Sequence, residues 1–227
     1  MTNNEILKVI EMIDDNNNKK AKDYLKTQLV KNTDKKGYNI LSLVKKIIIT
    51  KETESRPVLR TIQHTNNGEQ VIVDGFVGIK WKQHENAIDI MEQTPCEMSL
   101  QIDQIFRTMA NYTLTENDEI ILCNIDKVVD LIMADKQNKK DKYCQVSLFG
   151  KFFDLNVIKN VIKICLAYDN DFENTTFTTD EEATKPVQLE NENIKAIILP
   201  CRILDKEEQE KIDARTQQVV DIIKGVE

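Results

Sequence analysis

The chain is poor in glycine, proline, histidine and aromatic residues, and each shortage excludes a class of protein. Its 227 residues include six Gly and four Pro, too few for a collagen-like, linker-dominated or glycine-loop-rich chain. With two His and no Cys-x-x-Cys pair, it offers no zinc ligand set. No apolar run approaches the roughly 20 residues of a membrane-spanning helix. The five Cys lack paired spacing, which indicates reduced thiols and a cytoplasmic protein without a membrane association.

Motifs for nucleotide binding and covalent catalysis are missing as well. Neither G-x-x-x-x-G-K-[ST] nor G-x-G-x-x-G occurs, and the four Ser include no nucleophile elbow. We therefore expect a protein with no metal and no cofactor that is not an enzyme. The net charge of −7 argues against a protein that coats DNA, although a local basic surface remains compatible with it.

Apolar spacing predicts helices at both ends of the chain and strands between them. A helical hairpin is expected over 3–31, because Ile6, Leu7, Ile10 and Ile13 share one helical face. A linker at 32–37 and a short helix at 39–50 follow. Residues 59–64 and 70–73 flank Asn66-Asn67-Gly68, a sequence typical of a hairpin turn.

The second half repeats this alternation. Helical spacing covers 98–137, a strand-like segment covers 144–154 and a helix is expected at 155–167. Strands are expected near 172–179, 186–190 and 194–203, and a charged amphipathic helix at 205–224. The sequence thus predicts an α+β fold with antiparallel strands.

A helix followed by strands occurs twice, and the two copies share residues. NILSLVKKIIIT (39–50) and NVIKNVIKICLA (156–167) coincide at four of twelve positions: Asn39/Asn156, Val44/Val161, Lys46/Lys163 and Ile47/Ile164. Each helix precedes a basic-Pro-Val strand start, Arg56-Pro57-Val58 and Lys185-Pro186-Val187. Four identities can arise by chance in a chain rich in Ile, Lys and Asn, so both duplication and coincidence remain open.

Residues 146–203 resemble the closing half-domain of a bacterial sliding clamp, the DNA polymerase III β subunit. Leu199-Pro200-Cys201-Arg202-Ile203 is similar to the Met-Pro-Met-Arg-Leu-like terminus of that family. The segment from Arg56-Pro57-Val58-Leu59 to Asp74-Gly75-Phe76 is similar to the opening half-domain. Together these segments cover roughly half of the chain. The resemblance implies a clamp-like domain over 37–204, with half-repeats at about 38–83 and 144–204.

The rest of the chain departs from that family. Residues 1–36 form an added helical hairpin, 84–143 a helical insertion and 205–227 an added C-terminal helix. One domain cannot encircle DNA, so a ring would need about six copies. A compact clamp-like protein of a phage or mobile element, acting in replication, is the expectation that fits these features.

The resemblance also implies site residues. In clamps, Lys and Arg on channel-lining helices contact DNA phosphates without reading sequence, and such contacts position the protein but do not specify a site. The residues expected to contact duplex DNA are Lys45, Lys46, Lys51, Lys159 and Lys163. Solvated helix positions are the alternative for each of them.

Three functions remain open at this point. The first is a non-enzymatic clamp-like protein that associates weakly with duplex DNA. The second is a clamp-fold adaptor or inhibitor that binds a host replication or clamp-associated protein without gripping DNA. Its partner-binding residues would be Gln145, Leu148 and Phe149, which resemble a clamp-docking peptide, or Leu199, Pro200 and Arg202. The first segment has a simpler explanation as a strand leading into the second helix. The third function is a regulator that acts through its helical additions, with the clamp-like part as a scaffold.

Overall fold

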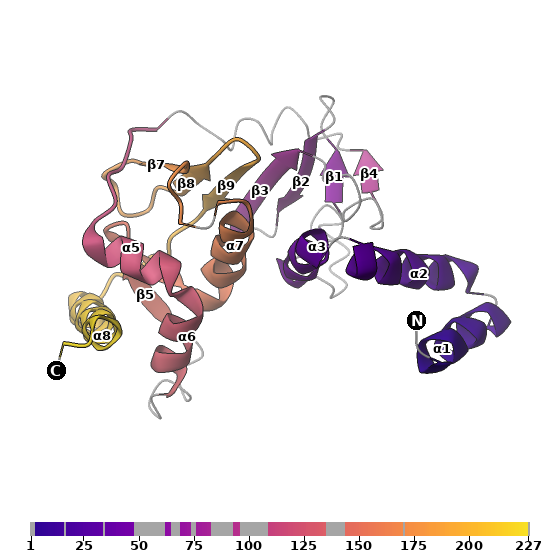
Figure 1. Ribbon diagram of the computed structural model, residues 1–227. Helices are drawn as coiled ribbons and strands as arrows, with labels where there is room; N and C mark the ends of the chain where they lie inside the picture. Colours follow the sequence, from indigo (N-terminus) through magenta and orange to yellow (C-terminus); the bar gives the residue numbers. More distant parts are fainter. Residues whose placement is uncertain are drawn as a thin grey trace.

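The computed structural model describes residues 3–15, 17–33, 35–47, 62–64, 69–73, 76–82, 93–95, 109–134, 144–169 and 171–226. Figure 1 shows a sheet with two helices beneath it, a helical hairpin that projects away on one side, and further helices on the other. The helices are α1 (Asn3–Asp14), α2 (Asn18–Thr33), α3 (Lys35–Ile47), α5 (Glu116–Cys123), α6 (Ile125–Ala134), α7 (Leu155–Tyr168) and α8 (Lys206–Lys224). The strands are β1 (Ile62–His64), β2 (Glu69–Val73), β3 (Val77–Lys82), β4 (Gln93–Pro95), β5 (Gln145–Leu148), β6 (Lys151–Asp154), β7 (Thr176–Thr179), β8 (Val187–Glu190) and β9 (Ile194–Ile198).

The main sheet has the strand order β4-β1-β2-β3-β9-β8-β7. Helix α3 precedes the antiparallel run β1-β2-β3, and α7 precedes the antiparallel run β7-β8-β9. The two runs meet where β3 pairs with β9 in antiparallel register, with Ile79 opposite Ala196. Each of the two helices is therefore followed by three antiparallel strands. The two sets of three strands join edge to edge at the β3-β9 pair.

Helices α3 and α7 pack side by side on the sheet because each presents an apolar face to it (Figure 1). In α3, Ile40, Val44 and Ile47 are buried at the spacing of one and two helical turns. In α7, Ile158 and Ile162 recur at the same spacing and are buried. Helix α3 contacts β2, and α7 contacts β3 and β9, so both helices share one core with the sheet.

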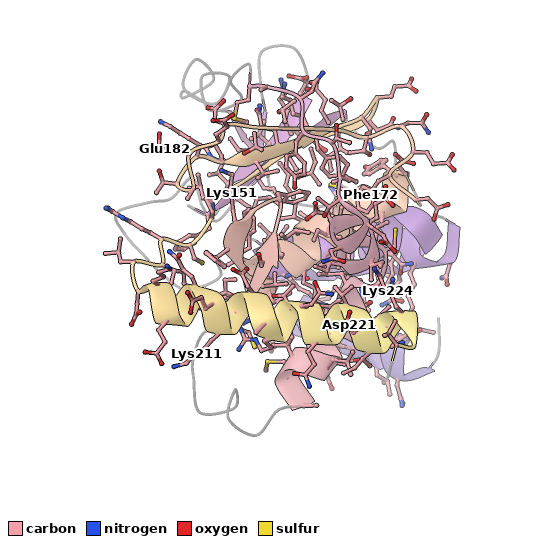
Figure 2. All side chains as sticks on the ribbon, turned by 90° about the vertical axis from the view of Figure 1, so that its left-hand side faces the viewer. Lys151, Phe172, Glu182, Lys211, Asp221 and Lys224 are labelled. Atoms are coloured by element: carbon pink, nitrogen blue, oxygen red, sulfur yellow. The ribbon has the colours of Figure 1, made fainter. Side chains whose placement is uncertain are left out.

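A second unit is built on a two-stranded sheet, β5-β6. Its turn is formed by Phe149 (φ 56) and Gly150 (φ 66), the two positive φ values of a tight hairpin turn. Helix α8 packs against β5 and lies at the front of the molecule in Figure 2. The backbone N–H of Ser147 donates to Thr216 Oγ1 at 3.0 Å, and Arg215 donates to the carbonyl of Gln145 at 2.6 Å. The C-terminal helix is thus an integral part of the described fold.

Residues between the two halves extend both ends of the strand run β1-β2-β3-β9-β8-β7. At one edge, β4 pairs in parallel with β1 and ends in Pro95, which has no N–H to donate. At the other edge, Asn111 bridges Thr178 of β7. The N–H of Tyr112 donates to the Phe177 carbonyl at 2.8 Å.

Most expected elements are confirmed, with local corrections. The hairpin 3–31, the helix at 155–167 and the helix at 205–224 are present as α1-α2, α7 and α8. The linker expected at 32–37 is wrong, because α2 continues to Thr33 and α3 begins at Lys35. The single strand expected at 144–154 is a hairpin, and the insertion 84–143 supplies strand β4 besides helices. The mixed α+β class with antiparallel strands is confirmed, while the strand start at 56–58 lies outside the described residues.

No helix within the described ranges is both long and apolar enough to cross a membrane.

Candidate nucleic-acid interface

Two of the predicted DNA-contacting lysines lie on one face of α7. Asp154 caps this helix by accepting a hydrogen bond from the Asn156 N–H at 2.8 Å, which is a favourable N-cap. Lys159 and Lys163 are one turn apart and half-buried, beside the buried positions Ile158 and Ile162. Each ammonium is partly exposed, so this face of α7 presents two neighbouring cations.

Asp126, at the start of α6, forms an ion pair with both lysines. Its carboxylate lies 3.1 Å from Lys159 Nζ and 2.6 Å from Lys163 Nζ. The hydrogen bond from Lys163, supported by the one from Lys159, lowers the pKa of Asp126, so the carboxylate stays charged at neutral pH. One negative charge thus partly neutralises the two positive charges.

The remaining predicted lysines lie on or after α3. Lys46 is exposed on α3, the helix that packs beside α7. Lys45 belongs to α3, but its side chain lies outside the described residues, as does all of Lys51. The structure therefore places Lys46, Lys159 and Lys163 on two adjacent helices. DNA contact by any of the five lysines stays a prediction.

A shallow hollow adjoins this helical surface. It has a volume of about 330 Å³ and lies between the start of α6 and α7, with Lys127 and Lys163 among its lining residues. Asp126 also lines it. The hollow therefore combines two cations, one carboxylate and the beginning of a helix.

The segment Gln145–Phe149 is part of the core. Leu148 is 1% exposed and Phe149 is 2% exposed, and the carbonyl of Gln145 accepts the hydrogen bond from Arg215. Docking of Leu148 and Phe149 on a partner would require this hairpin to unfold. The structure favours the simpler explanation, a strand in front of the second helix.

The other predicted partner-binding segment is accessible. Leu199 is 42% exposed, Pro200 is half-buried and Arg202 is exposed. The N–H of Leu199 donates to the carbonyl of Phe76 at 2.8 Å, and the Phe76 side chain is 61% exposed. Together, Phe76 and Leu199 place two large apolar side chains on the surface beside the end of β9.

Asp126 is the site residue that sequence patterns did not predict. It lies in the first turn of α6, where a carboxylate is ordinary. Only the packing of α6 against α7, more than 30 residues away in the chain, brings it to the lysines. A local sequence pattern carries no signal for such a contact.

No group of three or more His, Cys, Asp or Glu side chains that could hold a metal ion occurs within the described ranges. Comparison with protein-family models, with curated proteins and with solved structures found no match for this chain.

Proposed function

We propose that this chain is a non-enzymatic, clamp-like protein of phage or mobile-element replication that associates with duplex DNA through α3 and α7. The observation that carries the proposal is the paired arrangement of the two helices on a sheet whose halves follow the same order of elements. The exposed Lys46 on α3 and the partly exposed Lys159 and Lys163 on α7 support it, because phosphate contacts by lysine give affinity that does not depend on sequence.

The ion pair between α6 and α7 makes the DNA association weak in this proposal. A phosphate that approaches Lys159 or Lys163 must compete with the Asp126 carboxylate, which already holds both ammonium groups. The overall charge of −7 repels DNA in addition, and salt screens all of these charges. Weak binding that falls steeply with salt is therefore the expected behaviour.

The test compares variants on and off the proposed surface. Titration of a labelled duplex should show that K159E/K163E lowers affinity and reduces the slope of log K against log salt by about 2. K206E/K211E reverses the same number of charges on α8, where both lysines are exposed, and serves as the matched control. Equal losses for the two double variants would contradict a specific role for α7.

Replacing Asp126 tests the same surface through an expected rise, rather than a loss, of DNA affinity. Asp126→Asn frees both lysines and should raise DNA affinity about two- to fivefold at low salt, the range expected for a surface ion pair. Asp130→Asn removes an exposed carboxylate one turn further along α6 and controls for net charge. The proposal fails if Asp126→Asn binds DNA no better than Asp130→Asn.

An adaptor or inhibitor that binds a replication protein is the second candidate, and the exposed pair Phe76 and Leu199 favours it. In the resembling family, the corresponding terminus helps to form a pocket for partner peptides. Fluorescence anisotropy with a labelled Gln-Leu-x-Leu-Phe peptide should detect binding, and F76S/L199S should abolish it. I222S, a change of an exposed side chain on α8, is the control.

A further inference from the structure

The N-terminal hairpin α1-α2 carries a group of exposed aliphatic side chains. Six of them are 40–63% exposed, and they belong to both helices: Ile6, Leu7, Ile10, Ile13, Leu25 and Leu29. Only Val9 of α1 and Ala21 of α2 are buried among the described apolar residues of this hairpin. In Figure 1 the hairpin projects from the body of the protein, which it adjoins through the packing of α2 on α3.

The exposed residues of the two helices lie on the same side of the hairpin. At 3.6 residues per turn, Ile6, Ile10 and Ile13 follow the buried Val9 by about 40–100° around α1. Leu25 and Leu29 follow the buried Ala21 by about 40–80° around α2. In two antiparallel right-handed helices, the same rotation from the facing positions leads to the same side. These five residues, called the hairpin face below, therefore form one apolar surface.

The charges of the two helices are opposite. Helix α1 carries Glu5, Glu11 and Asp14 against Lys8. Helix α2 is rich in lysine, and its described Lys20 and Lys22 are exposed. Lys22 lies about 100° from Ala21 and Asp14 about 140° from Val9, so both border the hairpin face.

We infer that the hairpin face binds the same face of a second copy of this chain, forming a four-helix bundle across a two-fold axis. A second copy matches both properties, because it presents an identical apolar surface and the opposite charge on each facing helix. When the axis runs along the bundle, α1 of one copy faces α2 of the other, so acidic and basic helices meet. When the axis runs across the bundle, α1 would face α1 and like charges would meet. The charges favour the first arrangement.

The sheet edges favour this surface over strand pairing between copies. Edge strands are the usual sites at which sheets extend from one chain to another. Here β4 is short and ends in Pro95, and residues 110–112 hydrogen-bond to β7 at the other edge. The dimer is independent of DNA binding by α7, so either proposal can fail alone.

Sedimentation equilibrium of the full chain tests the dimer. The wild-type chain should dimerise in the micromolar range, and Ile10→Asp should weaken dimerisation about tenfold or more, because it places a charge in an apolar interface. Leu204→Asp, a change of a residue that is 79% exposed beyond β9, should leave it unchanged. Circular dichroism confirms that the variants retain their helices. A wild-type chain that stays monomeric, or an Ile10→Asp chain that dimerises normally, overturns the inference.

Charge reversal tests the arrangement of the helices. Asp14→Lys and Lys22→Glu each create like-charge contacts and should weaken the homodimer. Neither should disturb its own helix, because a cation near the end of α1 and an anion near the start of α2 are both favourable. An equimolar mixture of the two variants restores both opposite-charge contacts and should dimerise like the wild type. Normal homodimers of the single variants, or a mixture that fails to dimerise, contradict the facing of α1 and α2.

Discussion

Asp118 is the residue whose removal should destabilise the described fold most clearly. Its carboxylate is buried and accepts four hydrogen bonds. Oδ2 accepts from the Tyr112 hydroxyl at 3.0 Å and from the N–H and hydroxyl of Thr115 at 2.9 and 2.6 Å. Oδ1 accepts from the N–H of Phe149 at 2.8 Å. One side chain therefore closes the capping box of α5 and fixes the turn between β5 and β6.

The cost of Asp118→Ala can be added up from these contacts. Loss of the cap on α5 costs about 0.5–2 kcal/mol. The Phe149 N–H, which is buried at this bond, loses its acceptor at a cost of about 1–3 kcal/mol. We expect a total near 3 kcal/mol, a large part of the roughly 5–15 kcal/mol that stabilises a typical domain. Asp118→Asn keeps one oxygen acceptor and should cost about half as much.

Urea unfolding followed by far-ultraviolet circular dichroism measures this loss. With a slope of roughly 2–3 kcal/mol per molar urea, Asp118→Ala should lower the midpoint by about 1 M. Asp130→Ala removes an exposed carboxylate and should change the stability by less than about 0.5 kcal/mol. A midpoint for Asp118→Ala equal to that of Asp130→Ala would refute the role of these hydrogen bonds.

Three further results are expected. Burial, followed by the negative charge and hydrogen bond of the adjacent carboxylate, raises the pKa of Tyr112 from 10.0 to about 12. The folded chain therefore keeps this proton to higher pH than the unfolded chain, and some of the stability present below pH 10 should be lost between pH 10 and 12. The urea midpoint of Tyr112→Phe should fall less over this range, and parallel curves for the two proteins would contradict the assignment. The Lys151 ammonium donates to the Asp180 and Glu182 carbonyls at 2.8 and 2.5 Å (Figure 2). Lys151→Met should therefore speed the amide hydrogen exchange of residues 180–185, and unchanged exchange would show that these hydrogen bonds do not stabilise the loop. Burial raises the pKa of Cys165 to about 12. A thiol reagent should therefore label the exposed Cys123 in the folded chain and reach Cys165 only after unfolding. Mass spectrometry of the labelled peptides measures this, and labelling of Cys165 in the folded chain would contradict it.

The parts that the sequence predicted are those fixed by local spacing. Ile40, Val44 and Ile47 recur at helical intervals, and β1 and β2 pair in antiparallel register as expected for a hairpin. The apolar spacing in these elements reflects their burial directly. The elements could therefore be predicted without knowing which other elements pack against them.

The parts that it missed depend on distant residues. A phenylalanine rarely adopts a positive φ, so a turn at Phe149 was not expected. The carboxylate of Asp118, 31 residues upstream, stabilises that turn through the backbone N–H. In the same way, an apolar segment such as Leu148-Phe149 fits both a core strand and a docking peptide. Only tertiary packing distinguishes the two.

The sequence predicted the lysines of the candidate surface but not the carboxylate of Asp126 that pairs with them. Lys159 and Lys163 could be assigned to one helical face from their spacing alone. Their pairing with Asp126 joins α6 to α7 and changes the expected DNA affinity. Electrostatic sites of this kind depend on which helices meet, and local sequence spacing does not encode that.

The junction between β3 and β9 has a consequence for how the chain folds. It pairs Trp81 with Ile194 and Val77 with Ile198, residues more than 110 positions apart. Closing a loop of this length costs about 4 kcal/mol of chain entropy beyond a constant, so contacts of this kind make folding slow. At roughly 5–20 residues per second of synthesis, β3 emerges roughly 5–20 s before its partner strand. During that interval one side of β3 lacks β9, so nascent chains that end before residue 194 should be the ones that aggregate or recruit chaperones.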